Sequence, residues 1–88
     1  MATQAHVSTR TLAPINTRTR INLTGQEVCR LPNMPMRIRI VQGIAWITSQ
    51  QQDILARSGD TLDIPQQTHP VVISAANGAP MVCDIDFE

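Results

Sequence analysis

The chain of 88 residues contains no lysine and no tyrosine, and Trp46 and Phe87 are its two aromatic residues. Seven arginines balance seven acidic residues, so the formal net charge is zero. Nucleic-acid-binding proteins normally carry a net positive charge and clustered aromatic side chains that stack on bases. The lack of both argues against a nucleic-acid partner. No apolar run approaches the roughly 18 residues that a membrane-spanning helix needs, which argues against a membrane protein.

Histidine and cysteine are equally scarce. The chain has two of each, His6, His69, Cys29 and Cys83, and none stands at the spacing of a metal-binding motif. A transition metal normally takes three or four side-chain ligands, so we expect no metal and no other cofactor. Two cysteines do not make a disulfide framework, and we expect both as buried, reduced thiols. Because phosphate-binding and nucleophile-elbow motifs are also lacking, the sequence favours a protein that is not an enzyme.

The apolar residues that are present are mostly β-branched, with ten isoleucines and six valines against five leucines. Such residues pack well on a pleated sheet. Short apolar runs are separated by turn residues every eight to twelve positions, which is typical of a β-sandwich or barrel. The sequence therefore predicts an all-β fold of about eight short, mostly antiparallel strands. They are expected at 19–24, 27–31, 36–41, 44–49, 53–57, 61–64, 70–76 and 81–87.

The first 16 residues differ from the rest, because their apolar residues follow neither a helical nor a strand period. We expect residues 1–16 to be a flexible arm and residues 17–88 to be the β domain. Deleting the arm is expected to leave the domain folded; the alternative is a strand that docks on a second chain. The arm lacks the apolar stretch of a secretory signal, so we expect a cytoplasmic protein.

Charge is segregated along the chain. Residues 1–40 contain six arginines and one acid, whereas residues 41–88 contain one arginine and six acids. This pattern favours contacts between the two halves, either within one chain or between chains. We expect basic and acidic strands to face each other across one sheet.

Two of the predicted strands flank Gln42-Gly43, which reads as a two-residue hairpin turn because glycine accepts a positive φ. That hairpin would pair Arg39 with Trp46. Alternation then divides its side chains between two faces. The core face would carry Met36, Ile38, Ile40, Ala45 and Ile47, and the other face Arg37, Arg39, Val41, Ile44, Trp46 and Thr48.

The second of these faces is a candidate interface, formed by Arg37, Arg39, Ile44 and Trp46. Tryptophan and arginine are common anchors of buried interfaces, and a small domain gains stability from association. The sequence therefore predicts a homodimer, with Asp84, Asp86 and Glu88 as acidic partners of the arginines. The alternative is that Arg39 merely stacks on Trp46 at an exposed surface.

A weaker candidate polar site consists of Asp60, Asp63 and His69. The two carboxylates could act as a pair. However, an aspartate that follows glycine in a turn usually accepts hydrogen bonds from backbone amides, and a single histidine beside a proline is usually a loop residue. Asp84 and Asp86 are expected to form a solvated or arginine-paired stripe on one strand face.

The stretch from Arg37 to Ala76, about half of the chain, resembles a small bacterial cupin-like family, the DUF2917 type. The matching segments, in order, are Gly43-Ile44-Ala45-Trp46-Ile47-Thr48, Asp53, Gly59-Asp60, Leu62-Asp63-Ile64-Pro65 and Val71-Val72-Ile73-Ser74-Ala75. The resemblance implies a short cupin-like β-barrel or jelly roll, and it brings no established activity.

Most cupins bind a metal through histidines and a glutamate, and the corresponding positions of this chain hold other residues. The positions of the first motif fall on Ser49, Gln51 and Leu55 or Ala56, and the histidine of the second falls on Pro70, one residue from His69. We therefore expect a non-catalytic binding or assembly module. The alternatives are a small-molecule sensor that uses the barrel mouth, and a degenerate cupin enzyme.

Overall fold

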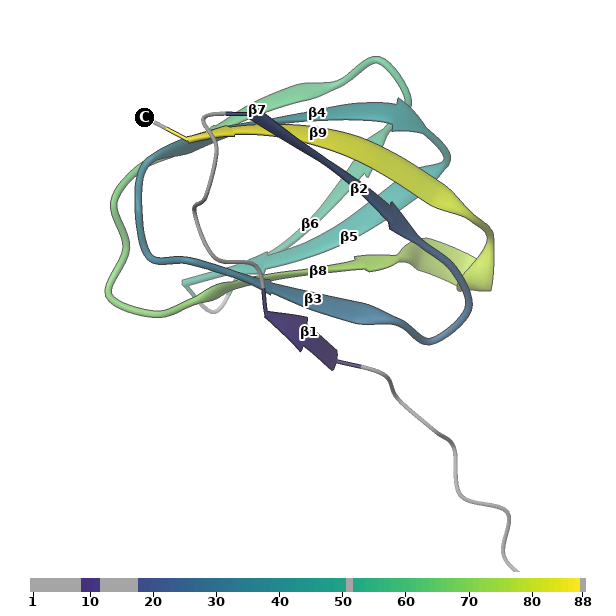
Figure 1. The fold of residues 1–88 in the computed structure, drawn as a ribbon, viewed down its shortest axis with the longest axis horizontal. Helices are drawn as coiled ribbons and strands as arrows, with labels where there is room; N and C mark the ends of the chain where they lie inside the picture. Colours follow the sequence, from purple (N-terminus) through teal and green to yellow (C-terminus); the bar gives the residue numbers. More distant parts are fainter. Residues whose placement is uncertain (1–8, 12–17, 51, 88) are drawn as a thin grey trace, which may run out of the picture.

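The structure, a computed structural model, describes residues 9–11, 18–50 and 52–87, and in this part of the chain it contains nine strands and one short 3-10 turn (Figure 1). The predicted all-β fold is confirmed, and each of the eight predicted strands is present within a residue or two of its expected bounds. The strands are β1 (Thr9–Thr11), β2 (Arg18–Leu23), β3 (Val28–Leu31), β4 (Met36–Gln42), β5 (Ile44–Ser49), β6 (Gln52–Arg57), β7 (Thr61–Ile64), β8 (Val71–Ala75) and β9 (Met81–Phe87).

The strands form two sheets that face each other, as Figure 1 shows. One sheet has the order β2-β9-β4-β7, and the other has the order β1-β3-β8-β5-β6. The pairings among β2 to β9 are antiparallel, and β1 runs parallel to β3. Successive strands often lie in opposite sheets, so the chain repeatedly crosses between the two layers.

The core lies between the sheets and is built by simple alternation. In β4 and β9, every second side chain is buried, and the intervening ones are exposed or half-buried. Because successive side chains of a strand point to opposite faces, each strand contributes one apolar row to the interior. The side chains with no measurable exposure include Leu23, Ile38, Ala45, Ile47, Val71, Ile73, Met81, Cys83 and Ile85.

The predicted hairpin between β4 and β5 is wrong, although its division into faces is largely right. β4 pairs with β7 and β9, while β5 pairs with β6 and β8. At Gly43, with φ of 80°, the chain passes from one sheet to the other. A type I′ hairpin turn needs a positive φ at both central residues, and Gln42 does not have one. The core face remains buried because both strands turn it toward the same interior.

The expectation that basic and acidic strands pair across one sheet is confirmed. The acidic strand β9 lies between the basic strands β2 and β4. Arg18 and Arg20 stand opposite Asp86 and Asp84 on one side of β9. This arrangement places unlike charges in direct cross-strand pairs, which stabilises a sheet, whereas like charges would destabilise it.

The N-terminal region adds a strand that the sequence analysis did not anticipate, since Thr9–Thr11 forms β1 on the edge of the five-stranded sheet. The remainder of the expected arm, 1–8 and 12–16, lies outside the described residues. It stays a prediction that the domain folds without the arm. The described part of the chain has no helix with the length and apolar character to cross a membrane.

Candidate functional site

Ser49, at the first of the positions where the cupin motifs would place a metal ligand, belongs to a buried polar pair without ionisable groups. Ser49 at the end of β5 donates its hydroxyl proton to Oε1 of Gln67 at 2.8 Å, and both residues are buried. Ala56 lies in the apolar core, while Pro70 and His69 are exposed in the loop before β8. Gln51 lies outside the described residues. No three His, Cys, Asp or Glu side chains gather as metal ligands within the described ranges.

The weaker polar site also does not assemble in the structure. Oδ2 of Asp60 accepts a hydrogen bond from the backbone N–H of Arg57 at 2.8 Å, so this carboxylate caps the turn between β6 and β7. Asp63 on β7 accepts a hydrogen bond from Nε of Arg37 at 2.7 Å. His69 is exposed and is not part of a cluster with them. Each aspartate therefore has a structural partner of its own.

The predicted interface residues separate onto opposite outer faces. Arg37 and Arg39 project from β4 on the four-stranded sheet, whereas Ile44 and Trp46 belong to β5 on the five-stranded sheet. Arg39 stands opposite Asp84 and Thr61, not opposite Trp46. The Arg39–Trp46 pairing is thus wrong, because the chain changes sheets at Gly43 between them. The structure instead presents two outer faces of different chemistry.

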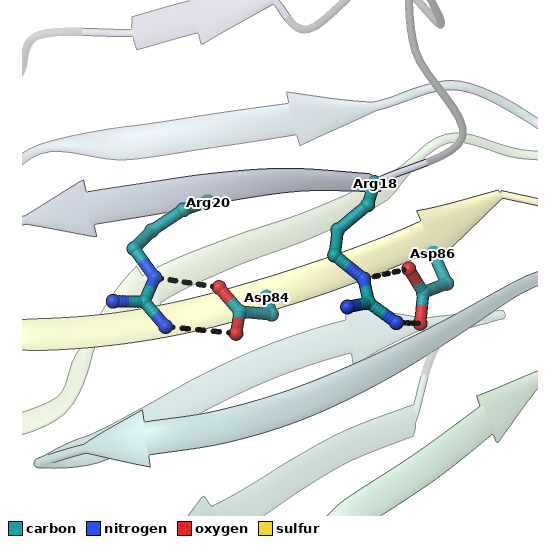
Figure 2. A network of polar contacts seen from close by, with 4 residues as sticks. All are labelled: Arg18, Arg20, Asp84 and Asp86. Atoms are coloured by element: carbon teal, nitrogen blue, oxygen red, sulfur yellow. Dashed lines mark hydrogen bonds and ion pairs between the residues drawn. The ribbon is translucent and has the colours of Figure 1, made fainter.

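The outer face of the four-stranded sheet is charged. Figure 2 shows its most regular part, where Arg20 contacts Asp84 through Nε at 2.7 Å and Nη2 at 3.0 Å, and Arg18 contacts Asp86 in the same way at 2.8 Å and 3.4 Å. The hydrogen bonds from Arg20 lower the pKa of Asp84 below its ordinary value. The expected arginine-paired stripe of Asp84 and Asp86 is therefore present. Any stabilisation from the Arg20–Asp84 pair is fully present above the ordinary aspartate pKa and is lost as the pH falls through the lowered pKa of Asp84.

The outer face of the five-stranded sheet is mainly apolar at its centre. Trp46 on β5 is 46% exposed, and its direct cross-strand partner on β6, Leu55, is 65% exposed. Ile44 on β5 and Val72 on β8 are half-buried beside them. Sequence analysis identified Trp46 and Ile44 but missed Leu55. The signal for it was the alternation of β6, which places Asp53, Leu55 and Arg57 on one face.

The two cysteines are buried, as expected, and the structure has no disulfide between them. Cys29 on β3 is 3% exposed, and Cys83 on β9 is not exposed at all. Burial, with smaller contributions from Cys29 and Asp84, raises the pKa of the Cys83 thiol from 9.0 to about 12. The thiolate is the reactive form of cysteine, so a raised pKa and burial both suppress reactivity.

We expect Cys29 and Cys83 to react with a thiol reagent only as fast as the protein unfolds. Adding denaturant should therefore accelerate labelling of both thiols together. Because the Cys83 thiol ionises near pH 9 when unfolded and near pH 12 when folded, its contribution to the free energy of unfolding should fall as the pH rises above 9. Rapid labelling of the native protein at neutral pH would contradict the buried placement.

Comparison with known proteins supports the fold and leaves the family open. No family model and no curated protein matches the sequence. A de novo designed double-stranded β-helix superposes with a TM-score of 0.68 at 14% identity, over 83% of this chain and 100% of the design. A cupin-2 domain protein from Shewanella frigidimarina NCIMB 400 superposes with a TM-score of 0.57 at 16% identity, over 90% of this chain and 78% of that protein.

A third similar structure is assigned as ethanolamine utilization protein Q from Salmonella typhimurium LT2, with a TM-score of 0.61 at 11% identity. The superposition covers 80% of this chain and 55% of that protein, so the chain spans about half of its length. At these identities the likeness concerns the backbone alone. The two crossed sheets, the strand order and these superpositions agree that the chain has the cupin-like double-stranded β-helix fold.

Proposed function

We propose that this chain is a non-catalytic assembly module of the DUF2917 type that acts in the cytoplasm as a homodimer. The observation that carries the proposal is the exposed Trp46–Leu55 pair at the centre of the five-stranded sheet. Large apolar side chains that lie together on a surface mark interaction sites, and tryptophan is the residue most often found at the energetic centre of an interface. The described part of the opposite outer face is covered by charged side chains and has no comparable pair of large exposed apolar residues.

A second copy of the chain fits this surface because its charge pattern is self-complementary. On β6 the outward side chains run Asp53, Leu55 and Arg57, with an acid at one end and a base at the other. Consider a two-fold axis that lies in the interface and runs from Trp46 to Leu55, perpendicular to the strands. This axis would stack the outer faces of two copies on each other, with β6 of one copy antiparallel to β6 of its partner. Each Asp53 then approaches the partner's Arg57, as a two-fold interface requires.

The described geometry gives less support to the two alternative functions, a small-molecule sensor and a degenerate cupin enzyme. A sensor would need polar groups that orient a ligand inside the barrel, but the two buried polar side chains among the described residues, Ser49 and Gln67, bind each other. A degenerate cupin enzyme would need ionisable groups at the positions of the metal motif, and the described ones hold Ser49, Leu55, Ala56 and Pro70. Two buried cysteines that form no disulfide are consistent with the reducing conditions of the cytoplasm.

The test of this proposal is the mass of the protein in solution. We expect the wild-type chain to be a dimer in light scattering at micromolar concentration. Trp46→Ala should weaken the dimer by about 30-fold or more, since loss of an interface anchor costs about 2 kcal/mol. Val41→Ala, which removes an exposed side chain from β4 in the other sheet, is the matched control and should leave the dimer intact.

A charge exchange makes the test specific for the proposed orientation. Arg57→Asp alone places two acids face to face and should weaken the dimer, especially at low ionic strength. The double variant Asp53→Arg/Arg57→Asp should restore it. A wild-type protein that remains monomeric at high micromolar concentration would refute the dimer, and a double variant as weak as the single one would refute the orientation.

A further inference from the structure

The charged face of the four-stranded sheet has one more arginine than it has aspartates among the described residues. Its arginines lie on β2 and β4 and its aspartates on β7 and β9; they are Arg18, Arg20, Arg37 and Arg39 against Asp63, Asp84 and Asp86. Three of these arginines form ion pairs with aspartates of the face, Arg18 with Asp86, Arg20 with Asp84 and Arg37 with Asp63. The remaining cation is Arg39, in the middle of the face.

Arg39 forms no hydrogen bond or ion pair with the carboxylate of its cross-strand neighbour. Asp84 is its cross-strand neighbour on β9, but Arg20 already holds one oxygen of that carboxylate at 2.7 Å and the other at 3.0 Å. On its other side, the cross-strand neighbour of Arg39 on β7 is Thr61, which carries no charge. Arg39 makes no hydrogen bond or ion pair with another described residue. Its guanidinium donors therefore face solvent.

Two hollows in the surface meet at this arginine. The first, of about 270 Å³, is lined by Arg18, Arg37, Arg39, Thr61, Asp84 and Asp86. The second, of about 390 Å³, extends from Arg39 and Asp84 toward Ser58 and Gly59 in the turn after β6. Both volumes exceed that of a single carboxylate or phosphoryl group. The donors of Arg39 thus open onto space that a small ligand can enter.

We propose that Arg39 anchors a binding site for the oxyanion group, a carboxylate or a phosphoryl group, of a small molecule on this outer face. The planar guanidinium offers parallel N–H donors that match the two oxygens of such a group. The hydroxyl of Thr61 supplies a further hydrogen-bonding group at the wall of the first hollow. Asp84 and Asp86 lie nearby, but Arg20 and Arg18 offset their charges. One bound anionic charge would balance the described charges of the face.

This site does not depend on the proposed homodimer. It lies on the outer face of the four-stranded sheet, whereas the proposed interface lies on the outer face of the five-stranded sheet. A dimer would therefore leave both copies of the hollow open. The proposals can also fail separately, because one is measured by molecular mass and the other by ligand titration.

The test is a titration of the full chain with sodium acetate and, separately, with sodium phosphate, followed by amide chemical shifts at constant ionic strength. We expect saturable shifts in β4, β7 and β9. Arg39→Gln should weaken binding by about tenfold or more, the effect of losing charge-assisted hydrogen bonds. Arg30→Gln, which removes an exposed arginine from β3 in the other sheet, is the matched control and should bind as wild type does.

The two probes also show whether the site binds a carboxylate or a phosphoryl group. Saturation by acetate assigns a carboxylate ligand, saturation by phosphate assigns a phosphoryl ligand, and saturation by both assigns the shared oxyanion chemistry. Shifts that rise linearly and equal those from sodium chloride would overturn the site. Binding that survives Arg39→Gln, or that falls equally in Arg30→Gln, would overturn the role of Arg39.

Discussion

Replacing Gly43 by alanine is expected to lower the free energy of unfolding by about 3 kcal/mol or more, a large part of the stability of a small domain. Gly43 has φ of 80°, which L-residues rarely adopt. A Cβ at this position would also clash with the carbonyl oxygen of Pro80 and lie 3.2 Å from Cα of Met81. Both obstacles belong to backbone that leads into the central strand β9, so neither can rotate away as a flexible side chain would.

The matched control for this variant is Gly25→Ala. Gly25 also has a positive φ, of 60°, but no atom lies within 4 Å of the position of its added Cβ. This variant should therefore show the conformational penalty alone, about 1–2 kcal/mol. Urea unfolding of the two variants separates the conformational penalty of a positive φ from the steric clash with Pro80. Equal destabilisation would mean that the crossing between the sheets relaxes and that the close approach to Pro80 contributes nothing.

Truncating Ile38 to alanine is expected to destabilise the fold by about 2–5 kcal/mol, because it leaves a cavity at the centre of the core. Ile38 lies on the inner β4 strand, between Leu62 of β7 and Ile85 of β9, and it is not exposed. Val41→Ala is the control on the same strand. Val41 points outward and is 40% exposed, so its truncation should cost no more than about 0.5–1 kcal/mol.

The comparison of these two variants tests the register of β4 directly. Unfolding by urea should give a lower midpoint for Ile38→Ala with an unchanged dependence on denaturant. A shift of the strand by one residue would exchange the two faces and reverse the order of the effects. If Val41→Ala were the more damaging substitution, the burial described for β4 would be wrong.

Much of the local structure follows from alternation within single strands. Alternation predicts that Met36, Ile38 and Ile40 face the core, and all three are buried. The ion pairs of β9 with its neighbour followed from the segregation of arginine and aspartate along the chain. These inferences need only the period of a strand and the sign of a charge, which are local properties.

Strand pairing could not be derived in the same way. β4 and β5 are separated by one residue and look like a hairpin, yet they belong to different sheets. Both arrangements bury the same apolar rows, because the core faces of the two sheets point at each other. What decides between them is the crossing at Gly43, where the backbone comes close to Pro80. That contact joins residues far apart in the sequence, so the local pattern does not contain it.

By itself, the sequence determined an all-β fold, the buried rows and the buried thiols. The tertiary structure alone decided which exposed side chains share a surface. In the structure Trp46 lies beside Leu55 and not beside Arg39. Arg39 lies next to Asp84, which Arg20 already binds. The reason is physical: alternation specifies the side of a strand on which a residue lies, whereas its neighbours on that side depend on long-range strand order.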